Sequence, residues 1–123
     1  LDANHRIPKE SHLFDNQIKT IVICKESDII NTENCIFECI DFESNIATQV
    51  SKILYKHQVQ SVIIEGGRQT LQTFIDADMW DEARIFKGTS LIEKGIKAPD
   101  FILKQNVTQT VCTDKLVITR KHD

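Results

Sequence analysis

The chain has 123 residues, of which 41% are hydrophobic, and a formal net charge of −3 at pH 7. This length predicts a single domain with a core of its own, and the acidic balance, with Lys and Arg scattered among the acids, argues against nucleic acid as a partner. No apolar run approaches the length that crosses a membrane, and no signal peptide is visible.

The first third of the chain predicts two strands. Residues 1–8 have no initiator methionine and are typical of a strand end that enters a loop, so we expect the natural protein to extend further upstream. Residues 20–24 are a short, continuous apolar run, which favours a strand covered on both faces, as in parallel sheets. Residues 36–40 are a second strand candidate, and Ser44 or Asn45 can cap the helix that follows.

The middle of the chain predicts a strand–helix–strand unit. Apolar residues recur along one helical face at Ile46, Val50, Ile53 and Leu54. Residues 61–65 then read as a third strand. Such a unit is expected to be right-handed and parallel.

The rest of the chain predicts a second helix and an antiparallel region. A helix is expected after Gly67, and residues 81–86 read as a strand followed by a loop. In residues 101–106 and 109–119, β-branched residues alternate partially with polar ones, which predicts one or two antiparallel strands.

The four cysteines have two interpretations. Cys24, Cys35, Cys39 and Cys112 do not form a paired Cys-x-x-Cys pattern, so their spacing gives little support to a zinc site. The favoured interpretation is small core or edge residues in a reducing compartment. The alternative is a redox pair of Cys35 and Cys39, but in one strand these would share a face and lie too far apart to bridge.

The junction Glu65-Gly66-Gly67 is the most informative motif. Glycines between a strand and a helix are often only turn residues. They also let a ligand approach the backbone, and the helix behind them offers free N–H groups and partial positive charge to a phosphate. The motif is neither the Gly-x-Gly-x-x-Gly fingerprint nor a Lys-bearing phosphate loop.

The side chains around this junction also have two interpretations. Arg68, Gln69 and Thr70 can reach a phosphate or ribose from the first helical turn, or they are solvated surface. Glu65 is either a buried carboxylate that binds a heterocycle or sugar hydroxyl, or an exposed acid at a strand end.

Other catalytic patterns are weak or missing in the sequence. Asp81 and Glu82 are neighbours in a predicted strand and face opposite ways, so a turn or strand-start role is favoured over acid–base work. The four histidines are separated and no zinc-deaminase signature or Gly-x-Ser-x-Gly elbow occurs.

Several blocks of the chain resemble one family. Residues 62–67 (Val-Ile-Ile-Glu-Gly-Gly), 74–77 (Phe-Ile-Asp-Ala) and 80–84 (Trp-Asp-Glu-Ala-Arg) are similar to the C-terminal reductase domain of the bifunctional riboflavin biosynthesis deaminase–reductase. The opening residues 1–8 resemble that family's strand-end segment, and the loop 95–99 fits a branch of the family.

This resemblance implies a fold and an activity. The fold would be dihydrofolate-reductase-like α/β, with a mostly parallel central sheet flanked by helices and antiparallel C-terminal strands. The activity would be NADPH-dependent reduction of 5-amino-6-(5-phosphoribosylamino)uracil to the ribitylamino form, in a cytoplasmic homodimer without a metal. The alternatives are another NADPH-dependent pyrimidine or dihydrofolate-type reductase of the same fold, and an inactive assembly fragment.

The resemblance also assigns site residues. Glu65 would contact the substrate, and no residue is an obvious general acid. The residues that would contact NADPH are Ala3, Gly66, Gly67, Arg68, Gln69, Thr70, Leu71, Gln72 and Thr73.

The chain departs from the family in extent. We expect residues 1–123 to be the C-terminal part of one reductase domain, because the family's domain begins well before Leu1 and its upstream part grips the substrate phosphate. The family's deaminase domain has no counterpart in these residues, and Lys87-Gly88-Thr89 stands where the family often has a proline.

Overall fold

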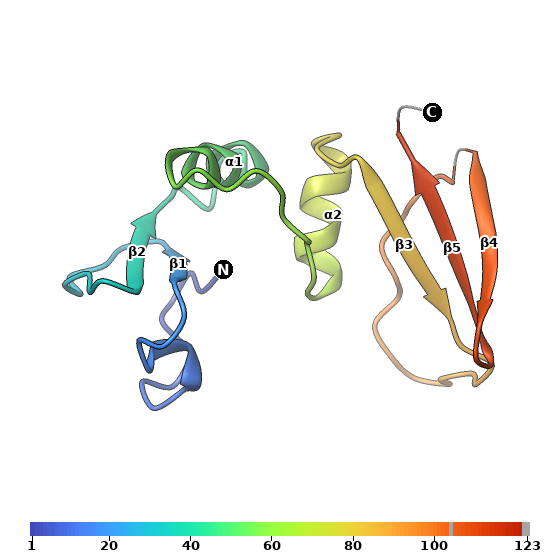
Figure 1. Cartoon of the computed structure of the whole chain (residues 1–123), viewed down its shortest axis with the longest axis horizontal. Helices are drawn as coiled ribbons and strands as arrows, with labels where there is room; N and C mark the ends of the chain where they lie inside the picture. Colours follow the sequence, from blue (N-terminus) through green and yellow to red (C-terminus); the bar gives the residue numbers. More distant parts are fainter. Residues whose placement is uncertain (104, 122–123) are drawn as a thin grey trace. The chain divides into compact units, whose positions relative to one another are not determined.

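The chain forms two compact units, which we describe separately. The computed structural model describes residues 1–103 and 105–121, and the contacts divide the chain into Leu1–Val62 and Ile63–Asp123. Figure 1 labels the helices and strands of both units.

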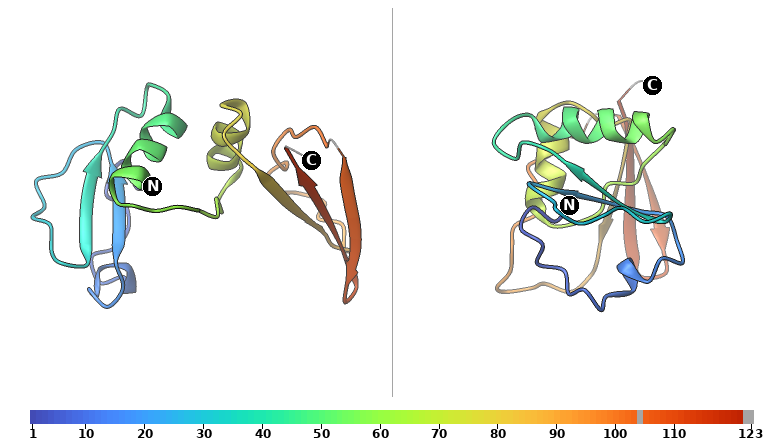
Figure 2. Two further views of the ribbon diagram at one scale, coloured as in Figure 1. Left: turned by 45° about the horizontal axis from the view of Figure 1, so that its top comes forward. Right: turned by 90° about the vertical axis from the view of Figure 1, so that its left-hand side faces the viewer.

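The first unit is built on a parallel pair of strands. β1 (Thr20–Cys24) pairs with β2 (Cys35–Cys39), in a register that sets Thr20 opposite Cys35 and Cys24 opposite Cys39. A short 3-10 helix, η1 (His12–Phe14), precedes β1. The helix α1 (Ile46–Lys56) follows β2 and lies over one face of the pair (Figure 2). Strand β1 and helix α1 confirm the sequence prediction, and β2 begins and ends one residue earlier than expected.

The core of the first unit comes from the predicted apolar faces. In α1, Val50 and Ile53 are buried, as the helical spacing predicts, whereas Ile46 and Leu54 are half-buried and Ala47 is buried in addition. The buried residues of α1 share this core with the strand residues Val22, Ile23, Cys24 and Cys35, and with Ile40.

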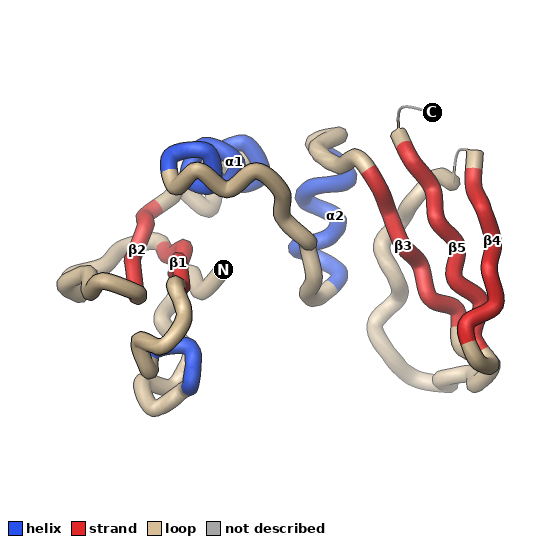
Figure 3. Tube along the Cα trace, in the orientation of Figure 1, coloured by secondary structure: helices blue, strands red, loops and turns tan. Residues whose placement is uncertain are grey.

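The predicted strand 61–65 is wrong. This segment is loop in the structure (Figure 3), and Val62 and Ile63 are 53% and 84% exposed. A strand exists only where its N–H and C=O groups pair with a neighbouring strand, and no residue among those described pairs with this segment. The strand–helix–strand unit therefore consists here of β2 and α1 alone, and parallel pairing among the described residues is confined to β1 and β2.

The second unit combines one helix with an antiparallel sheet. The helix α2 (Arg68–Asp76) comes first, followed by β3 (Glu82–Lys87), β4 (Asn106–Val111) and β5 (Asp114–Arg120). The strand order is β3-β5-β4, so β5 is the central strand and both of its neighbours run antiparallel to it. The buried residues of this unit are Phe74, Leu116, Val117 and Thr119.

The boundaries of the C-terminal strands differ from the prediction. Residues 101–103 are loop, and the apolar Phe101 packs its ring edge-on against that of Trp80, at 4.9 Å between centroids, without belonging to a strand. Residues 109–119 are a hairpin that turns at Cys112 and Thr113. Cys112 has a φ of 55°, a conformation for which such turns usually use glycine or asparagine, so this turn has no local signal in the sequence.

The structure holds neither a membrane span nor a metal cluster within residues 1–103 and 105–121. None of the helices there is long and apolar enough to cross a bilayer. No group of three or more His, Cys, Asp or Glu side chains there is arranged to hold a metal ion.

Candidate functional site

Helix α2 begins without a side-chain cap. Gly67 is its N-cap residue, and no side chain bonds the first-turn amides. The φ of Gly67 is −69°, which any residue adopts, and a Cβ added there would meet nothing within 4 Å. The amides of the first turn have no acceptor within the helix, and the helix dipole adds partial positive charge at this end. The start of α2 is therefore open to an anion.

Gly66 shapes the turn that leads into this helix. Its φ is 151°, which L side chains rarely adopt, whereas a Cβ would meet Thr70 only at ordinary contact distances from 3.6 Å. The backbone angle at position 66 thus requires glycine. At position 67 neither the backbone angle nor a neighbouring atom requires it.

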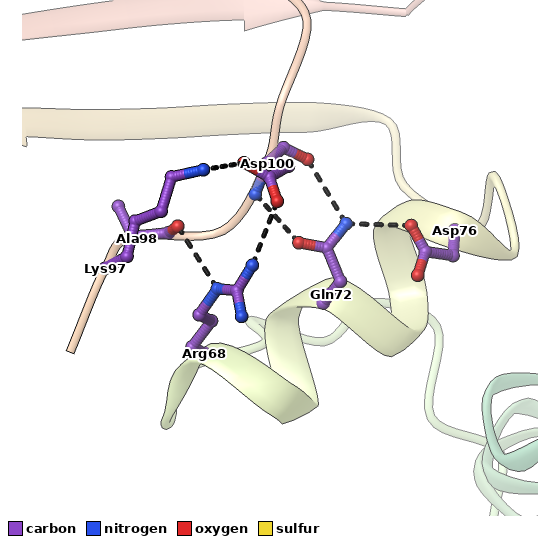
Figure 4. Close-up of polar contacts among 6 residues, drawn as sticks. All are labelled: Arg68, Gln72, Asp76, Lys97, Ala98 and Asp100. Atoms are coloured by element: carbon purple, nitrogen blue, oxygen red, sulfur yellow. Dashed lines mark hydrogen bonds and ion pairs between the residues drawn. The ribbon is translucent and has the colours of Figure 1, made fainter.

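Arg68 lies beside the helix start and is held by a loop (Figure 4). Its Nε donates to the carbonyl oxygen of Ala98 at 3.3 Å, and its Nη2 donates to the Asp100 carboxylate at 2.9 Å. Lys97 Nζ donates to the other oxygen of Asp100 at 2.6 Å. Lys97, and then Arg68, hold the pKa of Asp100 below its usual value. Two cations and one carboxylate therefore stand beside the open helix start.

The next turn of α2 fastens the same loop. Gln72 accepts from the Asp100 N–H at 2.8 Å and donates to the Asp100 carbonyl oxygen at 3.2 Å and to the Asp76 carboxylate at 2.7 Å (Figure 4). Thr73 donates its hydroxyl to the Gln69 carbonyl oxygen at 2.9 Å. The side chains of Gln72 and Thr73 thus already have partners within the unit.

The remaining predicted residues of this junction are more accessible. Gln69 is exposed, and Thr70 and Leu71 are half-buried. Glu65 is exposed and lies in a loop, and within the described parts of the chain its carboxylate has no ion-pair partner. Residues 65–73 therefore all lie in one unit. Among them, the backbone at Gly67 and the side chains of Gln69 and Thr70 are the groups most accessible to a ligand.

Ala3 belongs to the first unit, where it is fastened to the end of β1. Asp2 N–H donates to the Ile23 carbonyl at 2.8 Å, and Lys25 N–H donates to the Ala3 carbonyl at 3.2 Å. The Asp2 carboxylate accepts hydrogen bonds from the backbone N–H groups of Ile7 and Arg6, which lower its pKa. Ala3 thus sits at the carboxyl end of a parallel strand, the end where α/β sheets commonly bind ligands.

The Asp81-Glu82 pair has the structural role that the sequence favours. Glu82 begins β3, and its two oxygens accept from Arg84 at 2.6 Å and Arg120 at 2.9 Å. Arg84 and Arg120 lower the pKa of Glu82. Its carboxylate ties two strands of the sheet together instead of facing a reacting atom.

Two side-chain clusters in the first unit were not predicted from the sequence. Glu38 on β2 accepts from Lys56 Nζ at 2.8 Å and meets His57 Nε2 at 2.6 Å, and the side chains of Glu38 and His57 are only 16% and 12% exposed. Cys24 and Cys39 bring their sulfurs within 4.0 Å. Both clusters join residues at least 15 positions apart, so no short motif encodes them. The cysteine pair follows from the register of β1 and β2, and the Glu38 cluster from the place where the end of α1 meets β2.

The candidate site is an open surface within its unit. One surface hollow is lined by residues between Glu10 and Thr20, and another by Gln105, Asn106, Val107, Gln109, Ile118 and Arg120. Neither hollow includes any of residues 65–73. An anion at the start of α2 would therefore bind to backbone amides at the surface of this unit.

The comparisons with known proteins agree with the predicted fold. The solved structure of the Saccharomyces cerevisiae riboflavin biosynthesis reductase Rib7 is similar to the chain, with a TM-score of 0.67 and 19% sequence identity. The match covers 85% of this chain and 56% of that one, so the chain spans little more than half of that protein. This likeness confirms the α/β, dihydrofolate-reductase-like fold.

The comparison with sequence families gives the classification. No curated protein sequence matches the chain. A family model described as the RibD C-terminal domain matches residues 1–117, nearly the whole chain. The chain belongs to the family of RibD C-terminal domains.

Proposed function

We propose that this chain is the cofactor-binding part of a reductase of riboflavin biosynthesis. In this proposal the whole protein reduces 5-amino-6-(5-phosphoribosylamino)uracil to its ribitylamino form with NADPH. Family membership supports the pathway, and the fold is shared with a yeast reductase of that pathway. The whole protein would also carry a deaminase domain and act as a cytoplasmic homodimer on this small-molecule substrate.

The open start of α2 is the observation that carries the proposal. Gly67 leaves the first-turn amides uncapped and leaves space where a side chain would otherwise stand. A pyrophosphate fits such a site, because it accepts several N–H bonds and its charge is stabilised by the helix dipole. In this proposal the pyrophosphate binds to the backbone N–H groups of residues 67–70 and to the cations Arg68 and Lys97.

Each predicted contact residue has a role that its geometry allows. Gln69 and Thr70 would bind phosphate or ribose oxygens from the first turn, and Leu71, Gln72 and Thr73 would line the cofactor site along the next turn. Ala3, at the carboxyl end of β1, would leave room for the cofactor with its small side chain. Glu65, exposed before the two glycines, would bind the substrate.

The protein's contribution to the reaction is placement and electrostatics. The chemistry that bound NADPH would supply is a hydride, which C1′ of the open-chain or imine form of the ribosyl group would accept. Glu65 would orient the substrate, and α2 would fix the cofactor so that the reacting atoms meet. Among the described residues we assign no proton donor, so a substrate group, a water or the upstream segment of the whole protein would deliver the proton.

The test uses the full-length protein with Glu65→Gln and Gly67→Val. We expect Gly67→Val to weaken NADPH binding in a fluorescence titration, because its side chain fills the space at the helix start. We expect Glu65→Gln to lower turnover of the phosphoribosylaminopyrimidine while NADPH binding is retained.

Gly88→Ala is the matched control, because a Cβ at Gly88 has only an ordinary contact, with Asp114 at 3.8 Å. It should leave both NADPH binding and turnover unchanged. Undiminished reduction in both Glu65→Gln and Gly67→Val would refute the site. Turnover of dihydrofolate without turnover of the phosphoribosylaminopyrimidine would instead assign another reductase of this fold.

A further inference from the structure

Two thiols face each other at the carboxyl ends of β1 and β2. Cys24 and Cys39 are the last residues of the two strands and are opposite each other in the parallel register. Their sulfurs lie 4.0 Å apart. Both cysteines are free thiols in the structure.

The backbone between these thiols suits a disulfide. Neighbouring strands lie about 4.8 Å apart, and disulfides join Cα atoms that are about 4.4–6.8 Å apart. Residues paired in a ladder direct their side chains to the same face of the sheet. The sulfurs therefore need only side-chain rotation to reach the bonded distance of about 2.05 Å.

The two thiols differ in their access to solvent. Cys39 is exposed, whereas Cys24 is 0% exposed and directs its S–H toward the Glu38 carbonyl oxygen at 3.7 Å. Burial, followed by the Cys39 neighbour, raises the pKa of Cys24 to about 11. A dissolved reagent therefore reaches Cys39 first, and Cys24 reacts only from within the protein.

We propose that Cys39 is a site of thiol–disulfide exchange with low-molecular-weight disulfides and that Cys24 resolves the adduct into an intrachain Cys24–Cys39 disulfide. In the first step the Cys39 thiolate attacks one sulfur of the reagent. This forms a mixed disulfide and releases one reagent thiol. In the second step Cys24 loses its proton and attacks the Cys39 sulfur, which releases the second reagent thiol.

The exchange balances in atoms and electrons. The protein loses two hydrogen atoms and is oxidised by two electrons, and the reagent disulfide is reduced to two thiols. Burial raises the pKa of Cys24 and keeps it mostly in its thiol form at neutral pH, and the second step also needs the adduct that the first step makes. The mixed disulfide at Cys39 should therefore appear before the intrachain bond.

The other cysteines lack this arrangement. Cys35 starts β2, where its partner in the register is Thr20, and it lies four residues from Cys39 along the strand. That separation is about 13 Å in an extended chain, well beyond the reach of a disulfide. The sequence-based alternative of a Cys35–Cys39 pair is replaced by the pair across the two strands.

The test treats the reduced protein with oxidised glutathione under native conditions and then alkylates the remaining thiols. Cleavage after Lys25 and after glutamate separates the four cysteines, since Glu38 lies between Cys35 and Cys39. Mass spectrometry should find glutathione on Cys39 first, and later residues 20–25 linked to residues 39–43. Persistent glutathione on Cys39 without this linkage would overturn the resolving role of Cys24.

Variants separate the two steps. Cys24→Ala should hold the protein at the mixed disulfide on Cys39, whereas Cys39→Ser should leave Cys24 unmodified. Cys35→Ser and Cys112→Ser are the controls and should form the Cys24–Cys39 bond at the wild-type rate. Circular dichroism checks that each variant is folded, and the wild-type experiment decides the proposal without any variant. Linkage of Cys24 to Cys35, or no reaction at Cys39, would refute it.

Discussion

The α-helices α1 and α2 begin in opposite ways. At the start of α1, the Asn45 side chain accepts from the Thr48 N–H at 3.0 Å and so satisfies one of the first-turn amides. At the start of α2, Gly67 offers no side chain and the amides have no such partner. Both helices have an apolar face and a buried residue on it, so the difference does not come from their packing.

This difference separates a structural helix from one that can bind a ligand. An unpaired N–H group is unfavourable unless water or a ligand satisfies it, so a capped start favours stability and an uncapped start leaves room for an anion. The same contrast holds for the flanks. α1 is fastened at its end through the half-buried Glu38 and its partners, whereas α2 is flanked at its start by the half-buried Arg68 and the exposed Lys97.

The largest expected effect comes from making the start of α2 resemble that of α1. Gly67→Asp places a carboxylate where we propose the cofactor phosphate binds. We expect the affinity of the full-length protein for NADPH to fall about 100-fold, which corresponds to about 2.7 kcal/mol. Isothermal titration with NADPH measures this loss.

Gly67→Asn is the matched neutral variant. Its side chain caps the helix as Asn45 does but carries no charge. The affinity for NADPH should therefore fall about tenfold, because the side chain occupies the site without repelling the phosphate. The denaturation midpoint should stay close to that of the wild type in both variants, because glycine and asparagine differ little as caps. Wild-type affinity in Gly67→Asp would show that the cofactor does not use this helix start.

Local signals in the sequence were sufficient for most of the elements. The apolar run of residues 20–24 and the spacing of Val50 and Ile53 each specify their element through neighbours close in sequence. The turn at Gly66 could also be predicted, since few other residues adopt its backbone angles. The classification as a single domain, and the contacts of residues 65–73 with ligands, stay predictions.

What failed depended on partners distant in sequence. Residues 61–65 have strand-like composition, yet a strand forms only with a partner to bond to. The contact of Arg68 with Asp100 spans 32 positions, and no short motif encodes it. Likewise, the pairing of Cys24 with Cys39 follows from the register of two strands and not from cysteine spacing.

A smaller effect is expected from opening the start of α1. Asn45→Ala removes the acceptor for the Thr48 N–H and should lower the free energy of unfolding by about 1 kcal/mol. Chemical denaturation measures the change, with Ser44→Ala as the control, since the structure assigns the cap to Asn45. NADPH affinity should not change. A loss of NADPH affinity as large as that of Gly67→Asn would remove the distinction between the two helix starts.

The smallest effect is expected at the other end of α1, where it depends on pH. Lys56 above all, together with His57, lowers the pKa of Glu38 in the folded protein. The ionised Glu38 therefore stabilises the fold at pH values above the ordinary glutamate pKa. This contribution is lost as the pH falls through the lowered pKa. Glu38→Gln should therefore reduce the free energy of unfolding by at most about 1 kcal/mol at pH 7 and by progressively less below about pH 4.5. Denaturation of wild type and variant across this range measures the difference, and the exposed Glu43→Gln serves as the matched control. A constant difference between wild type and Glu38→Gln at all pH values would mean that Glu38 supports α1 through packing and not through its charge.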